Sequence, residues 1–168
     1  MNWKRFLTDE IESTYRATEG IIDLVDEDAL DWKPTTGENW MTTGQLLRHI
    51  ADACGKCFQG FVTGDWGMPM DGEVEMLPPA HKMPSVTSIA EAKELLEADK
   101  QIALAMLDQC SEVDLAEQKI TAPWDPREVI LGEQLLHMIG HLAQHKTQLF
   151  YYMKLEGKPV YTGTLWGL

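Results

Sequence analysis

The chain is poor in the residues that several common chemistries need. Of its 168 residues only three are cysteines and four are serines, and no serine lies in a Gly-x-Ser-x-Gly turn. A glycine-rich phosphate loop and a Gly-x-Gly-x-x-Gly dinucleotide motif are also missing from the sequence. The sequence therefore gives no support for a serine hydrolase with that turn, a P-loop nucleotide enzyme or a Rossmann dehydrogenase.

Positive charge is scarce as well. The chain has 14 Lys and Arg against 27 Asp and Glu, a formal net charge of -13, and its basic residues form no run. Proteins that bind nucleic acid present a basic patch to the phosphates, and anionic membrane surfaces attract basic segments. We therefore expect neither a nucleic acid nor a membrane surface as partner.

Long apolar runs are absent too. No stretch approaches the roughly 20 apolar residues that span a bilayer, and the first residues include acidic ones where a signal peptide would be apolar. Three cysteines, an odd number, do not resemble a secreted disulfide framework. We expect a cytoplasmic protein with free thiols, and the length predicts a single domain over residues 1–168.

Apolar residues recur near the helical period of 3.6 in four segments. They predict helices over about residues 2–28, from Thr42 through Phe58, over 86–109, and over a segment that ends before Gly157. The last helix begins either at the Asp125-Pro126 cap or one to two turns later near Gly132. Only residues 116–124 could be extended. Four amphipathic helices indicate an all-α four-helix bundle.

The connection from Gly64 to Ser85 is unusually long and contains three Gly and four Pro. Connections of this length are either crossovers or functional loops. We expect this one to be a crossover of the bundle or a loop over a site.

Three histidines are the strongest functional signal. His141 and His145 lie four residues apart, so they share one helix face with Cβ atoms about 6 Å apart. They fall within the apolar stripe of the last helix, and His49 lies on the apolar side of the second. Buried imidazoles need partners, and a divalent metal ion bound by all three would provide one. Three neutral imidazoles leave coordination positions open, which is typical of a reactive ion such as Zn, Ni, Fe or Co.

The alternative interpretation is a trio of core histidines without an ion. His137 lies eight residues before His145, over which the helix turns about 80° out of line. We therefore expect it either to support the ligands from behind or to lie on the flank of the bundle, with its contribution to the site left open. His81, in the Pro-rich connection, is expected to be solvated.

Cys54 and Cys57 form a Cys-x-x-Cys pair, which without a second pair is a weak zinc signal. A redox pair would favour a helix N-terminus, whereas the predicted helix places both cysteines two or three turns inside it. We interpret them as core residues, with their contribution to the histidine site left open.

Several motifs resemble those of one family. They are Trp32-Lys33-Pro34, Asn39-Trp40-Met41-Thr42, Leu46-Leu47-Arg48-His49-Ile50, His141-Leu142-Ala143-Gln144-His145-Lys146-Thr147-Gln148 and Lys154-Leu155-Glu156-Gly157. Over nearly its whole length the chain resembles the DinB (damage-inducible) superfamily, which is grouped with YfiT-like metal-dependent hydrolases. Where the family usually has His-Arg-Gly-Gln, this chain has His145-Lys146-Thr147-Gln148, which keeps the imidazole and the Gln.

The resemblance implies a four-helix bundle with a long crossover, often a homodimer, in which His49, His141 and His145 hold a divalent ion. The superfamily includes transferases and isomerases that use low-molecular-weight thiols. The first expectation is therefore a metal-dependent transferase that joins such a thiol to a small electrophile, as in detoxification. A metal-dependent hydrolase and a non-enzymatic, metal-stabilised dimeric binding protein are the alternatives. No general base is indicated. Four residues could contact the ligands or the substrate: Gln144, Gln148, Tyr15 and Tyr151.

Overall fold

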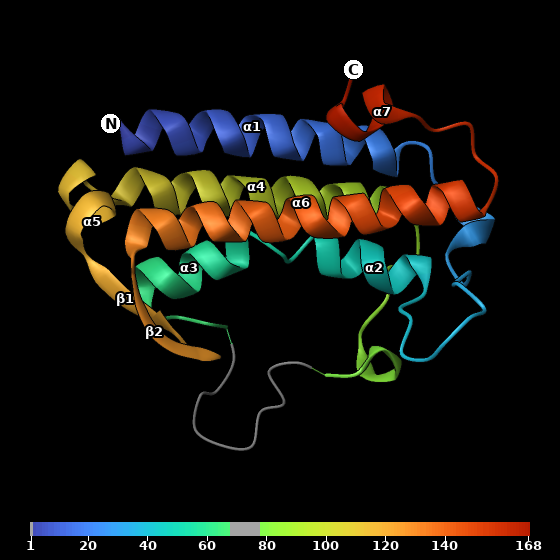
Figure 1. Cartoon of the computed structure of the whole chain (residues 1–168), viewed down its shortest axis with the longest axis horizontal. Coiled ribbons are helices and arrows are strands. Elements are labelled where there is room, and N and C mark those ends of the chain that lie inside the picture. Colours follow the sequence, from blue (N-terminus) through green and yellow to red (C-terminus); the bar gives the residue numbers. More distant parts are fainter. Residues whose placement is uncertain (1, 68–77) are drawn as a thin grey trace.

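The computed structural model describes residues 2–67 and 78–168. Of the three long helices, α1 (Trp3–Ile22) packs against both α4 (Ile89–Gln109) and α6 (Leu131–Leu155). Two shorter helices, placed end to end, take the fourth position of the bundle (Figure 1): α2 (Thr43–Ile50) and α3 (Gly55–Thr63). Helices α3 and α4 run in the same direction, so the segment that joins them is a crossover, of which residues 68–77 lie outside the described part. The predicted all-α four-helix bundle with a long crossover is confirmed.

Smaller elements close the ends of the bundle. They are the 3-10 turns η1 (Glu27–Ala29) and η2 (Ala80–Lys82), the helices α5 (Glu112–Glu117) and α7 (Thr162–Trp166), and the strands β1 (Lys119–Ala122) and β2 (Asp125–Ile130). The two strands form an antiparallel hairpin in which Lys119 pairs with Ile130. Strand β1 lies within the segment expected to be extended.

Each long helix buries one stripe of apolar side chains. Leu7 and Ile11 of α1 and Leu135, Leu142 and Leu149 of α6 have no exposed surface. Their spacings of four and seven residues keep them on one face of each helix. The core therefore lies where these faces meet, and the histidines of α6 lie along the same helix.

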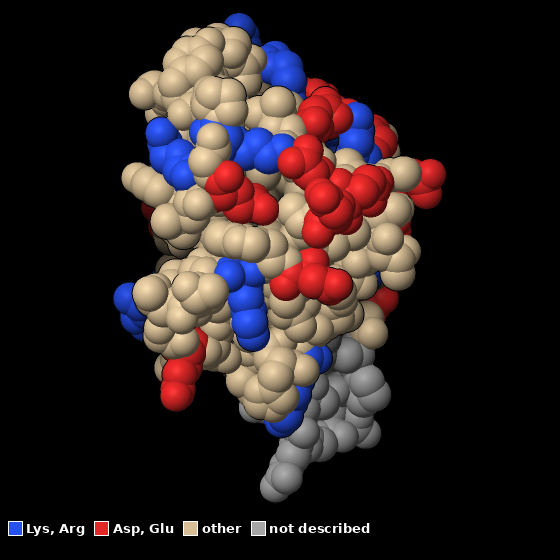
Figure 2. All heavy atoms as spheres, turned by 90° about the vertical axis from the view of Figure 1, so that its right-hand side faces the viewer, with Lys and Arg blue, Asp and Glu red and all other residues tan. Residues whose placement is uncertain are grey.

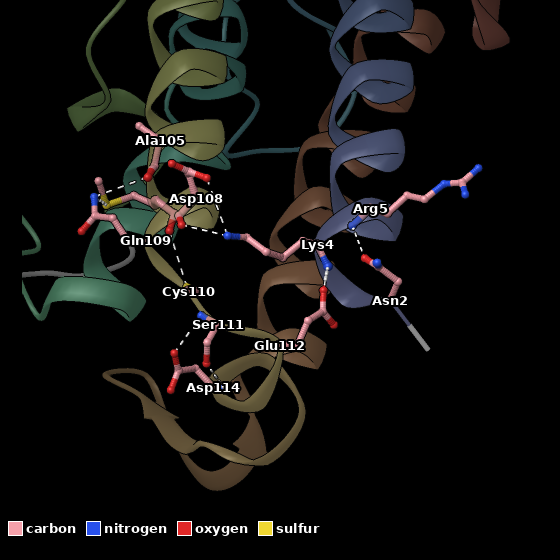
Figure 3. A network of polar contacts seen from close by, with 11 residues as sticks. Asn2, Lys4, Arg5, Ala105, Asp108, Gln109, Cys110, Ser111, Glu112 and Asp114 are labelled. Atoms are coloured by element: carbon pink, nitrogen blue, oxygen red, sulfur yellow. Dashed lines mark hydrogen bonds and ion pairs between the residues drawn. The ribbon is translucent and has the colours of Figure 1, made fainter.

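The beginning of α1 is tied to the corner between α4 and α5 (Figure 3). The backbone N–H groups of Trp3 and Lys4 donate to the Glu112 carboxylate at 2.8 and 2.9 Å. The Asn2 side chain accepts from the N–H of Arg5 at 2.8 Å, and Lys4 Nζ donates to the Asp108 carbonyl at 2.9 Å. A carboxylate and an N-cap thus satisfy N–H groups that have no partner within the helix.

The predicted second helix is interrupted, which corrects the expectation of one continuous helix from Thr42 through Phe58. The Thr42 capping box is present, but α2 ends at Ile50 and α3 begins at Gly55. The buried carboxylate of Asp99, on α4, accepts from the N–H groups of Gly55 and Lys56, both at 2.9 Å. The Asp99 carboxylate therefore caps the N-terminus of α3, and its residue has an exposed fraction of 1%.

The boundaries of the outer helices also differ from the sequence pattern. Helix α1 ends at Ile22 instead of near residue 28, and α4 covers Ile89–Gln109 as predicted for 86–109. Helix α6 begins at Leu131, so of the two predicted starts the one near Gly132 is confirmed and Asp125 lies in a strand. Gly157, with a φ of 81°, follows the helix end as expected for a left-handed cap.

The C-terminal segment with Tyr161 and Trp166 includes the short helix α7, which packs against α1. Lys146 of α6 donates to the Leu165 carbonyl at 2.8 Å and lies over the ring of Trp166. Among the described helices, none combines the length and the apolar composition that crossing a membrane requires.

Candidate metal centre

His49, His141 and His145 come together in the structure. The Nε2 atom of His145 lies 3.0 Å from Nε2 of His49 and 3.0 Å from Nε2 of His141. One ring nitrogen of each histidine lies within 4.8 Å of those of the other two, and all three side chains are partly buried. The sequence therefore predicted correctly which three imidazoles converge, whereas their binding of a metal stays a proposal.

Two elements supply these side chains. His141 and His145 follow each other by one turn on α6, and His49 lies in the last turn of α2, which packs against α6. The fully buried Leu46 and Ile50 direct the inner face of α2 toward the core. His49 lies between them in sequence and keeps its ring at the edge of that face.

Hydrogen bonds from outside the trio orient two of the rings. The Nδ1 atom of His141 lies 3.0 Å from the Ala53 carbonyl oxygen, and Nδ1 of His145 lies 3.0 Å from Oε1 of Gln148. A carbonyl or amide oxygen only accepts, so each of these Nδ1 atoms carries the ring hydrogen. The Nε2 atoms of both rings are then unprotonated and present lone pairs to the centre of the trio.

This arrangement fits a divalent cation. A neutral imidazole has one ring hydrogen, so of the three Nε2 atoms only that of His49 could carry a hydrogen. The three Nε2 atoms therefore cannot all be paired by hydrogen bonds among themselves. Nitrogen ligands at the usual 2.0–2.1 Å from one ion lie about 2.9 to 3.4 Å apart, which matches the separations of 3.0 Å. Converging ring nitrogens, two of them on rings whose N–H points outward to an oxygen, are the pattern of a metal-binding histidine group.

Burial keeps the three imidazoles neutral. It lowers the pKa of His49 to about 4, with smaller contributions from the neighbouring His145 and His141. Burial also lowers the pKa values of His141 and His145, while the Ala53 carbonyl and Gln148 partly offset this. Metal binding requires the unprotonated ring, so the ligand atoms are in the right state at pH 7.

The carbonyl that orients His141 depends on the break between α2 and α3. Ala53 lies in the turn between the two helices, one residue before the α3 N-cap Cys54. Within a continuous helix this carbonyl would accept from the N–H four residues later. Asp99 holds the start of α3 and thereby holds the neighbouring carbonyl where the Nδ1 of His141 can reach it.

The three histidines line an open pocket of about 460 Å³. Its wall includes Met41 from the segment before α2 and Met83 and Pro84 from the end of the crossover. Gln45 donates to the carbonyls of Ala80 and Met83 at 2.8 and 2.9 Å and fixes that part of the crossover. The expectation that this long connection borders a site is met by its described end.

The segment before α2 contacts Tyr152 of α6, near His145. Trp32 and Trp40 pack edge-on against Tyr152, with ring centroids 5.3 and 6.1 Å apart. The hydroxyl of Tyr152 donates to the Met41 carbonyl at 3.0 Å and also interacts with Gln148. Side chains from the Trp32 and Asn39-Trp40-Met41 motifs thus support Gln148, which in turn orients His145.

The comparisons with known proteins agree with this architecture. The family model of the DinB superfamily matches residues 10–149, most of the chain. The chain belongs to the DinB superfamily. A comparison with curated proteins finds no match. A DinB-like protein from Bacillus subtilis, YjoA, has a similar solved structure, with a TM-score of 0.65 and 19% identity over 92% of this chain and 94% of that one. At this identity the likeness shows the DinB-like fold.

The other histidines lie away from the centre. His137 is exposed on α6, as expected for the bundle flank, and His81 is exposed in η2, as expected for a solvated residue. Gln148 contacts His145 of the trio, whereas Gln144 is exposed and Tyr151 has 59% of its surface exposed. Tyr15 instead donates to Asp99 at 2.7 Å.

The Cys-x-x-Cys pair lies elsewhere in its helix than predicted. Cys54 is the N-cap of α3 and Cys57 lies in its first turn, so the pair is at a helix N-terminus after all. Burial, with the nearby carboxylates of Asp99 and Asp52, raises the pKa of Cys57 to about 12. Burial and Asp99 also raise the pKa of Cys54, which has no exposed surface. The core interpretation is confirmed for Cys54, which is fully buried, whereas Cys57 is half-buried.

Proposed function

We propose that the chain is a metal-dependent enzyme that transfers a low-molecular-weight thiol to an electrophilic small molecule. The observation that carries this proposal is that three converging imidazoles line an open pocket, each still partly exposed. A structural metal site would be closed by four protein ligands, whereas a catalytic site keeps a position for a small molecule. A divalent ion here would lower the pKa of a thiol or a water and supply a nucleophile at neutral pH.

The chain's own residues have separate tasks in this scheme. His49, His141 and His145 would hold the ion, while Ala53 and Gln148 keep the Nδ1 hydrogens of the last two rings turned away from it. The apolar side chains of Met41, Met83 and Pro84 limit the water around the reacting atoms and offer contact area to an apolar electrophile.

The test is a conjugation assay on protein loaded separately with Zn²⁺, Ni²⁺, Fe²⁺ or Co²⁺. A thiol reacts with a chlorodinitrobenzene as the C–S bond forms, the C–Cl bond breaks, and the thiol proton passes to solvent. We expect a rate that rises with metal content and falls to background in His145→Ala, whereas Gln144→Ala retains the wild-type rate.

Other outcomes favour the alternatives. If thiols give only the background rate while metal-loaded protein cleaves an activated ester, the hydrolase is supported. If neither reaction depends on the metal, the chain is a binding protein whose ion or histidines stabilise the fold.

A further inference from the structure

The pocket above the histidines has one strongly polar side. Arg48 and Asp52 line it together with Met83 and Pro84; Arg48 belongs to α2 and Asp52 to the turn that follows it. Within the described residues, neither side chain hydrogen-bonds to an imidazole of the trio, although the Asp52 carboxylate acts on His49 through its charge. The Arg48 guanidinium therefore lines the pocket without serving the histidines directly.

Two cations share one carboxylate at this place. Arg48 Nη2 lies 3.1 Å from Asp52 Oδ2, and Lys56 Nζ lies 2.7 Å from Asp52 Oδ1. The group of three has a net charge of +1 in a chain whose net charge is -13. A divalent ion on three neutral imidazoles would add two more positive charges. The pocket is then a positive region that favours anions, although the molecule as a whole repels them.

Arg48 has hydrogen-bonding capacity left after it pairs with Asp52. Its Nε is buried, and no hydrogen-bond partner for it is found within the described part of the chain. Glu91, at the start of α4, also acts on Arg48 through its charge, while its carboxylate accepts from the N–H and hydroxyl of Thr87. A guanidinium has five N–H donors and binds a carboxylate through two of them. The Arg48 side chain keeps 24% of its surface exposed, so an anion in the pocket can reach its Nη donors beside Asp52.

Resting on the proposed function, we propose that one of the two small molecules carries a carboxylate that Arg48 binds while the reacting atom lies at the histidines. Arg48 is thus a specificity-determining residue of the pocket. Asp52 competes for the same guanidinium and sets how strongly it attracts the substrate.

The first experiment measures binding to Co²⁺-substituted protein through the visible spectrum. The probes are 3-mercaptopropionate and its neutral isostere 3-mercaptopropionamide. We expect the carboxylate to bind more tightly by about tenfold, the change that 1.4 kcal/mol produces. Arg48→Gln should abolish this preference and leave the affinity for the amide unchanged. Asp52→Asn should increase the preference, an effect in the opposite direction that loss of folding cannot produce.

A second experiment asks whether the carboxylate is on the electrophile. It compares the KM values of 4-chloro-3,5-dinitrobenzoate and the corresponding benzamide, with 3-mercaptopropionamide as the thiol. A preference for the benzoate that disappears in Arg48→Gln assigns the carboxylate to this reactant. The matched control is Arg127→Gln, which removes an exposed arginine that is also paired with an aspartate but lies outside the pocket.

The outcomes separate this inference from the proposed function. If both thiols change the Co²⁺ spectrum but neither experiment shows a preference that depends on Arg48, the inference is overturned and the thiol chemistry stands. If neither thiol changes the spectrum, the proposed function is contradicted and this inference fails with it.

Discussion

Gln148 shows how a single residue outside the trio can control it. Its side-chain oxygen accepts from Nδ1 of His145 at 3.0 Å and fixes which ring nitrogen faces the centre. Loss of such a partner usually lowers metal affinity by about 10–100-fold. We therefore expect Gln148→Ala to weaken metal binding by at least about tenfold, measured by competition with a chromophoric chelator. Gln144→Ala, on the exposed face of the same helix, is the control and should bind as the wild type does.

Equal affinities of Gln148→Ala and the wild type would contradict this role. Such a result would mean that helix packing alone orients the His145 ring. The Gln148 position belongs to the motif that ends in His145-Lys146-Thr147-Gln148, so sequence could name it as one of several candidates. Sequence could not name the Ala53 carbonyl, because a backbone oxygen leaves no trace in the residue type.

His49 gives the metal-free protein a pH-dependent stability. Its native pKa of about 4 lies below the ordinary value of 6.5. Between these two values the unfolded chain binds more protons than the native one, so the free energy of unfolding falls as the pH falls from about 6.5 toward 4. Urea unfolding of metal-free wild type and His49→Gln over this range should show a shallower pH dependence in the variant. Parallel curves would show that His49 does not titrate in this way.

At the scale of elements, the start of α3 lies very close to α4. A Cβ atom on Gly55 would lie 2.0 Å from the Asp99 carbonyl oxygen, whereas one on Gly140 of α6 has no neighbour within 4 Å among the described atoms. We expect Gly55→Ala to lower the free energy of unfolding by about 3 kcal/mol, in the range for overpacking. Gly140→Ala should raise it by about 0.5–1 kcal/mol, because alanine favours a helix. Urea unfolding of both variants tests this, and a neutral Gly55→Ala would contradict the close approach of α3 to α4.

Asp99, on α4, also contributes to the stability of the contact between α3 and α4. Its removal leaves the Tyr15 hydroxyl and the N–H groups of Gly55 and Lys56 without their acceptor in the core. Each buried unsatisfied group costs about 1–3 kcal/mol, so Asp99→Ala should lose about 3 kcal/mol or more of stability. Tyr15→Phe removes only one of these bonds and should lose about 1 kcal/mol.

The metal affinity of Asp99→Ala supplies a second measurement. Because the start of α3 positions the Ala53 carbonyl, we expect weaker metal binding in Asp99→Ala and unchanged binding in Tyr15→Phe. Unchanged affinity in both would mean that the carbonyl holds its place without Asp99.

The helices themselves could be predicted more fully than their ends. Period and caps located α1, α4 and the C-terminal end of α6, because apolar stripes and cap residues are local signals. The break before Gly55 could not be predicted, since Ala53, Cys54 and Phe58 stay buried on both sides of it and keep the helical pattern. Its cause, Asp99, lies 44 residues away from Gly55 in the sequence. Of the hairpin from Lys119 to Ile130, only the first strand could be predicted, because it lies within the one segment that the sequence pattern allows to be extended.

At the scale of the whole molecule, charge is unevenly placed. Figure 2 shows acidic side chains gathered on one side of the end of the bundle that it views, with basic ones beside them. The positive group of Arg48, Asp52 and Lys56 is an exception to the acidic composition, and it lies at the candidate site. The single domain, the homodimer and the cytoplasmic location stay predictions from the sequence.

The central claim is that three imidazoles form a metal site that lines an open pocket. The most direct measurement is metal content per chain, by elemental analysis of protein purified without a nickel column. We expect about one ion per chain in the wild type and in His137→Ala, and loss of the ion in His49→Ala, His141→Ala and His145→Ala. A wild type that holds no ion after incubation with Zn²⁺, Ni²⁺ or Fe²⁺, or an ion that persists in those three variants, would contradict it.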